Sequence, residues 1–108
     1  MRSTIELNVR ETGRTCVVGF GEHDFLMLHT TQFREELSDL IEHYGAEVLT
    51  VDMSGVKAIS SEVFGTLAWL LGRVRLRIAN PSELVREVLS ATRLDEEIEI
   101  VEEEAVPA

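Results

Sequence analysis

The residues with the clearest capacity for chemistry are two adjacent hydroxyls, Ser60 and Ser61, within residues 51–65. An apolar strand is predicted before them, a loop carrying Gly55 comes next, and apolar residues at helical spacing follow. Ligands and modifications gather at the carboxyl ends of strands in open α/β sheets, and a helix N-terminus offers unpaired amides and a positive dipole end. We therefore expect the serines to open a helix at a site that accepts a phosphate.

The same two hydroxyls also have a purely structural interpretation. A serine at a helix start ordinarily caps the helix by accepting a backbone N–H, which contributes about 1 kcal/mol and needs no kinase. Glu62 adds a carboxylate that favours the helix start but disfavours a further negative charge beside it. From the residues alone, both capping and modification stay open.

Other residues that could do chemistry are too scattered to form a recognisable site. His23, His29 and His43 have no paired ligand spacing, and the single Cys16 lacks a second thiol, so we expect no metal site. No nucleophile and base are spaced near Asp52, so we interpret its carboxylate as an acceptor for loop amides. Without a phosphate-binding glycine loop or a catalytic triad, we expect no enzyme, no catalytic residue and no cofactor.

Charge and hydropathy exclude several classes of partner. The 108 residues carry 20 acidic and 10 basic side chains, and the formal net charge of −10 repels nucleic acid and anionic lipid surfaces. The strongly apolar stretch at residues 63–71 is far shorter than the roughly 20 residues of a membrane-spanning helix, and the N-terminus lacks a signal-peptide apolar region. We therefore expect a cytoplasmic protein that binds neither nucleic acid nor membrane.

The elements that must position the serines alternate between strand and helix. Residues 4–9 and 15–20 flank a glycine turn and predict a hairpin. Further strands are predicted at residues 48–53, which are apolar enough to be central, at 73–78, which alternate strictly, and at 98–102. A first helix is predicted to begin at Thr30 or Thr31 and to end at Tyr44. A second is predicted to begin near Ser60 and to end before Gly72, and a third to begin at Pro81.

Helical spacing also predicts which residues face the core. These are Phe33, Leu37, Leu40, Ile41 and Tyr44 in the first helix, Val63, Phe64, Leu67, Leu70 and Leu71 in the second, and Leu84, Val85, Val88 and Leu89 in the third. Asn80 is predicted to cap the third helix, with Glu83 completing a capping box. Trp69 is predicted to cover the sheet or to anchor a partner, and Gly65 to allow close approach to the sheet.

This element order predicts an α/β fold in a single domain over residues 1–102. The sheet is expected to be mixed, with four to five strands and with the helices packed mainly on one side. One core suits a chain of this length. Residues 103–108 are predicted to form an acidic C-terminal tail, and the charge run before them to be a solvated edge.

The segment around the serines resembles the signature of the STAS domain found in anti-sigma-factor antagonists. The similar residues are Asp52-Met-Ser54-Gly55-Val56, then residues 58–65, 78–89 and 92–95, so the resemblance covers nearly the whole chain. It implies a STAS-like fold with a shortened second helix of about three turns. The sequence departs from the family pattern at Ser60, Glu62 and Val63, where an aspartate, a small hydroxyl and a glycine are usual.

In this family, a serine at the helix start is phosphorylated by a kinase that is itself the anti-sigma factor, and phosphorylation releases the partner. The resemblance therefore implies a partner-binding regulatory protein, with Ser61 as the phosphorylated residue and Ser60 as the alternative. A phosphate adds about −1.5 to −2 charges, which can bond helix amides or repel an acidic partner surface. The implied contact residues for an anti-sigma factor or serine kinase are Asp52, Ser54, Gly55, Lys57, Ser60, Ser61, Glu62 and Phe64.

A second hypothesis keeps the fold and removes the switch. The chain would then be a scaffold or assembly subunit, in which the serines only cap the helix and a sheet edge or Trp69 mediates association. A homodimer and a small-molecule ligand stay open under either hypothesis, and the sequence identifies no particular partner.

Overall fold

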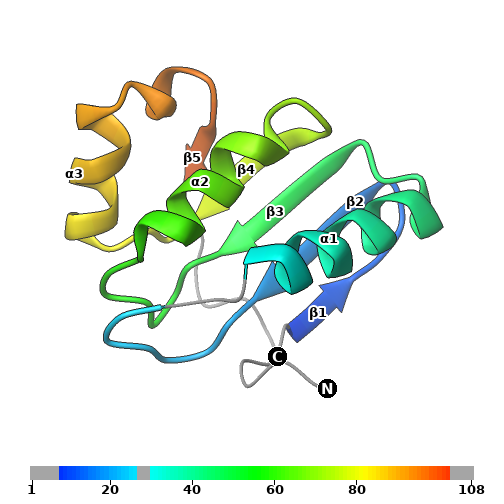
Figure 1. The fold of residues 1–108 in the computed structure, drawn as a ribbon, viewed down its shortest axis with the longest axis horizontal. Coiled ribbons are helices and arrows are strands. Elements are labelled where there is room, and N and C mark those ends of the chain that lie inside the picture. Colours follow the sequence, from blue (N-terminus) through cyan, green and yellow to red (C-terminus); the bar gives the residue numbers. More distant parts are fainter. Residues whose placement is uncertain (1–7, 27–29, 103–108) are drawn as a thin grey trace.

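The computed structural model describes residues 8–26 and 30–102 (Figure 1). The strands among these residues are β1 (Asn8–Glu11), β2 (Thr15–Gly19), β3 (Val48–Asp52), β4 (Arg75–Ala79) and β5 (Glu99–Val101). The helices are α1 (Thr30–Tyr44), α2 (Ser61–Leu70) and α3 (Glu83–Ala91), and a 3₁₀ turn, η1 (Leu94–Glu96), precedes β5.

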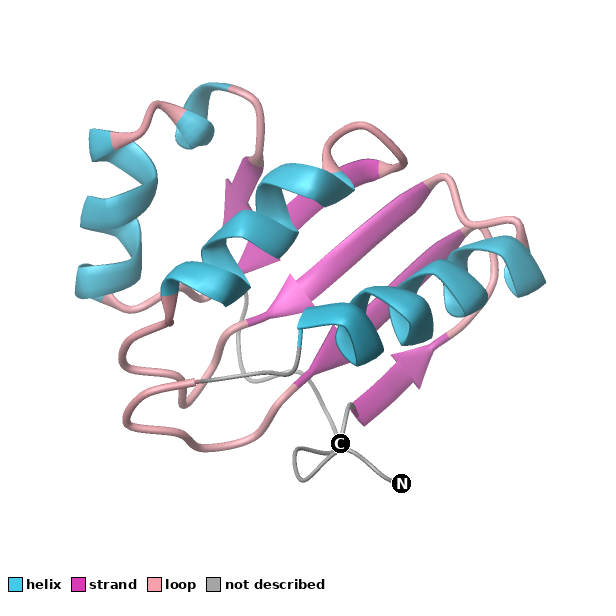
Figure 2. Ribbon diagram, in the orientation of Figure 1, coloured by secondary structure: helices cyan, strands magenta, loops and turns pink. Residues whose placement is uncertain are grey.

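The sheet follows the order of the chain. Its strands lie in the order β1-β2-β3-β4-β5, with β1 antiparallel to β2 and the other pairs parallel. Parallel neighbours joined by right-handed crossovers place their helices on the same face. Figures 1 and 2 show α1 and α2 over one face of the sheet, with α3 at its β5 side. The predicted mixed sheet of four to five strands with β3 at its centre is confirmed.

The core lies between this sheet face and the helices. Parallel register places Cys16, Leu49 and Leu76 in one row and Val18, Val51 and Ile78 in the next, and all six side chains are buried. Burying a Val, Leu or Ile side chain contributes about 1.5–3 kcal/mol, so these rows stabilise the sheet strongly. The alternation predicted for residues 73–78 is also confirmed, because Val74, Leu76 and Ile78 are buried whereas the arginines between them are exposed or, at Arg77, half-buried.

The remaining boundaries largely follow the predictions. β1 and β2 form the expected hairpin from Asn8 onward, whereas residues 4–7 of the predicted first strand lie outside the described residues. Helix α2 has ten residues, which agrees with a shortened second helix. The predicted tail at 103–108 also lies outside the described part of the chain, so the domain division at residue 102 stays a prediction. None of the described helices is both long and apolar enough to cross a bilayer.

Three residues predicted to face the core are exposed instead. Tyr44 at the end of α1 is 42% exposed, and Leu84 and Val88 on α3 are 56% and 40% exposed. Helix α3 buries only the stripe made by Val85 and Leu89. Because neighbouring residues on a helix point about 100° apart, the residue before each member of that stripe faces away from the core.

The predicted cap of α3 is also wrong. The Ser82 hydroxyl caps this helix by accepting the Val85 N–H at 3.1 Å, and the helix begins at Glu83. Asn80 adopts a left-handed conformation with φ 55°, and its N–H donates to the Val101 carbonyl at 2.9 Å. Because this left-handed backbone is not the extended one of an N-cap residue, which Ser82 has, the helix starts only beyond Pro81.

Candidate functional site

The loop that links β3 to α2, residues 53–60, is built like an extension of the sheet. We call it the β3–α2 loop, and we call residues 20–26, which follow β2, the β2 loop. The His23 N–H donates to the Gly55 carbonyl and the Leu26 N–H to the Ala58 carbonyl, both at 2.9 Å. In return, the N–H of Lys57 donates to His23 and that of Ser60 to Leu26. The two loops therefore form a short parallel ladder beyond the strand ends.

Gly55 is required at the closest approach of these two loops. It has a positive φ of 83°, which side-chain-bearing residues rarely adopt. A Cβ placed there would lie 3.1 Å from Glu22 Cγ and 3.2 Å from Glu22 Cα. Both the backbone conformation and the packing therefore favour glycine.

A buried carboxylate fixes the beginning of the β3–α2 loop. Asp52 is 2% exposed, and its Oδ1 accepts the Ser54 N–H at 3.0 Å and the Ser54 hydroxyl at 2.6 Å. The Asn80 side-chain amide donates in turn to Ser54 Oγ at 3.2 Å. Asp52 thus accepts a loop amide, as interpreted from the sequence, and holds the loop from inside. Being buried, it is not available to contact a partner directly.

The other flank of the loop is tied to α3. The Ser82 hydroxyl donates to the Lys57 carbonyl at 2.7 Å while it caps the helix. The Lys57 ammonium forms an ion pair with Asp24 at 3.3 Å, and both side chains are largely exposed. Exposed pairs contribute little stability, so the loop is held mainly by its main-chain bonds and by Ser82.

Ser60 and Ser61, which the sequence alone does not distinguish, differ in exposure and in hydrogen bonding. Ser60 is 4% exposed, has an extended backbone, and accepts the Val63 N–H at 3.3 Å through its hydroxyl as the N-cap of α2. Ser61 is the first residue of the helix and is exposed. The geometry therefore disagrees with Ser60 as the alternative phosphorylation site, because its hydroxyl is buried and engaged.

The other predicted contact residues divide by exposure. Ser54, Gly55, Lys57 and Glu62 are exposed, whereas Phe64 is half-buried and packs against the core. Glu62 lies in the first turn of α2, where a negative charge is favoured by the helix dipole. The exposed part of the predicted contact surface therefore consists of the loop and the first two residues of α2.

Sequence reasoning missed the residues that brace this loop. Ser82 was available as a signal, because Asn80-Pro-Ser-Glu83 contains two residue types that commonly cap helices. The pairing between the two loops has no local signal, since it depends on strands brought together by the fold. The His23 ring is held within the β2 loop, because its Nε2 lies 3.0 Å from the Phe20 carbonyl oxygen and donates to it.

The Trp69 side chain on α2 packs beside α1 and does not extend freely into solvent. The ring is half-buried against the core, with the guanidinium groups of Arg73 and Arg34 at 4.3 and 5.2 Å from its centroid. The ring therefore packs beside α1, and whether it covers the sheet or anchors a partner stays a prediction. The expected contact of Gly65 with the sheet is wrong, because the nearest atom to a Cβ there is Arg34 Nη2 on α1, at 3.9 Å.

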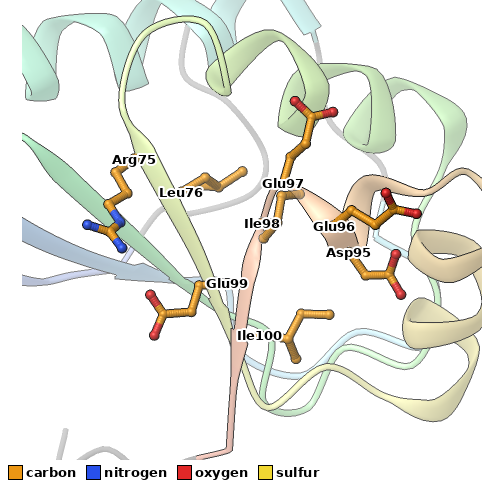
Figure 3. Close-up of a pocket in the computed structure, with 8 residues that line it drawn as sticks. All are labelled: Arg75, Leu76, Asp95, Glu96, Glu97, Ile98, Glu99 and Ile100. Carbon is orange, nitrogen blue, oxygen red and sulfur yellow. The ribbon is translucent and has the colours of Figure 1, made fainter.

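A separate hollow of about 690 Å³ lies at the opposite end of β4 and β5. Its lining residues are Arg75, Leu76, Asp95, Glu96, Glu97, Ile98, Glu99 and Ile100. Figure 3 shows the carboxylates of Glu97, Glu99 and Asp95 pointing in different directions. Within residues 8–26 and 30–102, no three His, Cys, Asp or Glu side chains form a group that could hold a metal ion.

Comparison with known proteins identifies similar chains. A family model described as "Mlab, STAS domain" matches residues 7–102. The solved structure of the anti-sigma factor antagonist SpoIIAA in its unphosphorylated form has 19% sequence identity and a TM-score of 0.72, over 88% of this chain and 87% of that one. A Thermotoga maritima protein provisionally described as an anti-sigma factor antagonist has the same identity and TM-score, over 88% and 85%. No curated protein sequence matches.

Proposed function

This chain belongs to the STAS domain family, and from that premise we propose that it is a regulatory protein that binds an anti-sigma factor or a serine kinase. The proposed contact surface is the exposed part of the β3–α2 loop and the start of α2. Phosphorylation of Ser61 switches the affinity for the partner. The fold shared with anti-sigma factor antagonists supports the class of protein, and the site geometry supports the residue.

The main support for this proposal is that the two serines differ in burial and in hydrogen bonding. Ser60 caps α2 from a buried position, which leaves the exposed Ser61 free of that structural task. A kinase would transfer the γ-phosphoryl group of ATP to Ser61 Oγ. The new O–P bond replaces the bond to the β-phosphate, ADP leaves, and the hydroxyl proton passes to a base on the kinase.

A phosphate at this position would change the local surface strongly. It would add about −1.5 to −2 charges next to Glu62, within reach of the first-turn amides of α2. A partner that packs on the loop would have to accommodate this dianion or desolvate it. An affinity change of about fivefold or more is therefore expected.

In this role the chain acts as a cytoplasmic binding protein and not as an enzyme. The carboxylate closest to the loop in sequence, Asp52, is buried and accepts two hydrogen bonds from Ser54. It therefore supports loop geometry and does not face a substrate.

The test is phosphorylation of the purified chain by the cognate kinase and ATP, followed by intact mass measurement. Wild type and Ser60→Gly should gain one phosphate, and Ser61→Ala should gain none. Ser90→Ala is the matched control, because Ser90 is an exposed serine near the end of α3, outside the proposed contact surface, and should not affect the gain. A phosphate retained by Ser61→Ala, or none on wild type, would reject Ser61 as the acceptor.

A second candidate is a scaffold or assembly subunit that lacks the switch. It is favoured by one observation: Ser60 and Glu62 already satisfy the start of α2 without a phosphate. Light scattering separates the two candidates. A stable higher oligomer that is indifferent to Ser61→Ala supports scaffolding, whereas a monomer or dimer that binds a kinase supports the switch.

A further inference from the structure

We propose that Phe25, Leu84 and Val88 are the apolar anchors of a docking surface on either side of the β3–α2 loop, and that its occupant is a protein with an apolar contact face bordered by Lys and Arg. We call these three residues the anchor residues. The inference rests on the proposed function, because it specifies the chemistry of the partner that this loop would bind.

Phe25 belongs to the β2 loop, which pairs with one side of the β3–α2 loop. Its neighbour Leu26 is fully buried and donates its N–H to the Ala58 carbonyl, and His23, two residues before Phe25, forms main-chain hydrogen bonds with Gly55 and Lys57. The backbone on both sides of Phe25 is thus fixed, yet its side chain is 54% exposed. Leu26 supplies the core contact of this segment, so the aromatic ring beside it is not needed for packing.

Leu84 and Val88 lie on the other side, one turn apart on α3. The core contacts of this helix are made by Val85 and Leu89, so the two exposed side chains form a second apolar stripe. This stripe starts next to the loop, because Ser82 at the head of α3 donates to the Lys57 carbonyl. Figure 1 shows the two loops and the beginning of α3 at the same end of the sheet.

The charges around the anchor residues favour a basic partner over a second copy of the chain. Exposed carboxylates lie on the β2 loop, at the start of α2 and on α3, at Glu22, Glu62, Glu83 and Glu87. The ammonium of Lys57 is already paired with Asp24, and the guanidinium of Arg86 is paired with Glu102. A partner with Lys and Arg around an apolar centre is therefore attracted, whereas a second copy meeting this surface face to face would bring the same carboxylates together.

The test places a photo-crosslinking amino acid, p-benzoylphenylalanine, at Phe25 or Leu84 of the full chain in the cells that produce it. Mass spectrometry then identifies the crosslinked peptides. Tyr44 is the matched control, because it is a similarly exposed ring at the far end of α1. The expected result is that both anchor positions crosslink one partner through apolar segments flanked by Lys or Arg, while the control does not.

Three results would overturn the proposal. These are the absence of crosslinks from both anchor positions, crosslinks mainly to acidic segments or to a second copy of the chain, and equal crosslinking from the control. With the crosslinked partner purified, Phe25→Ala and Leu84→Ala should each weaken binding about tenfold or more, as anchors of an interface do. Tyr44→Ala should change it less than about twofold, and raising the salt from about 0.05 M to about 0.5 M should weaken it.

The same partner separates this inference from the proposed function. If phosphorylation of Ser61 leaves binding unchanged while the anchor substitutions abolish it, the switch fails and the docking surface stands. If the crosslinker placed at Ser54 captures a partner that phosphorylation releases, and neither anchor position does, the switch stands and the docking surface fails.

Discussion

The two serines at the head of α2 should differ sharply in their contribution to stability. Ser60→Ala removes the hydroxyl that accepts the Val63 N–H, and both residues are nearly inaccessible to solvent. Loss of a serine cap costs about 1 kcal/mol, and an unpaired buried N–H raises this toward about 2 kcal/mol. Ser61→Ala removes an exposed hydroxyl and should change the free energy of unfolding by less than about 0.5 kcal/mol.

Urea and thermal unfolding, followed by far-ultraviolet circular dichroism, measure this difference. For a domain of this size, the loss at Ser60 corresponds to a fall in Tm of about 4–8 °C for each kcal/mol, and no resolved change is expected for Ser61→Ala. Ser60→Gly is the control, because it leaves the same Val63 N–H unpaired while glycine is better tolerated than alanine at a cap position, so it should lower the free energy of unfolding less than Ser60→Ala does. Equal losses for the two alanine variants would refute the assignment of Ser60 as the cap and of Ser61 as the free hydroxyl.

Further predictions concern the loop and α3. In urea titrations, Gly55→Ala should lower the free energy of unfolding by about 1 kcal/mol more than Gly45→Ala. Both glycines have a positive φ, but only Gly55 lies close to another backbone segment, at Glu22. Equal losses would contradict the close approach of the two loops at Gly55. In the same assay, Ser82→Ala should lower the free energy of unfolding by about 2 kcal/mol, because the helix cap and the hydrogen bond to the Lys57 carbonyl are both lost. A loss below about 0.5 kcal/mol would show that neither bond stabilises the fold. Leu89→Ala should lower the free energy of unfolding by about 2–5 kcal/mol, because Leu89 is fully buried, and Leu84→Ala by less than about 0.5 kcal/mol, because Leu84 is exposed. The reverse order would mean that α3 packs through its other face.

The order of strands and helices could be predicted because each element carries a strong local pattern. The apolar run at residues 48–53 indicated a strand buried on both sides, and it forms the centre of the sheet. The alternation after Gly72 gave both the faces of β4 and the exposure of Arg75. Such patterns reflect burial directly, so they survive without knowledge of the tertiary contacts.

The errors arise where a tertiary contact decides between local alternatives. Asn80 and Ser82 are both good caps, but Asn80 pairs its N–H with Val101 in a left-handed conformation, whereas Ser82 has the extended backbone that an N-cap needs. Leu84 and Val88 fit a wide apolar face, but α3 buries a narrow one. Neither outcome is visible from a window of neighbouring residues.

The candidate site was predicted in position but not in its internal arrangement. Asp52, Ser54 and the serine pair were all identified from the sequence, and the structure brings them to one strand-to-helix connection. The difference in exposure between Ser60 and Ser61 needs the helix phase and the pairing with Leu26, which no motif encodes. The partner, the phosphorylation and the anchor residues stay predictions for the experiments above.

The ladder between the two loops bears on how fast and how tightly a partner can engage. Fixing the backbone of one free residue costs about 1–2 kcal/mol in conformational entropy, and here that ordering is complete before any encounter, through bonds such as Ser60 N–H to the Leu26 carbonyl. A recognition element that is preorganised in this way loses little freedom on complex formation. Differences between competing partners should therefore appear mainly as differences in residence time and not in association rate.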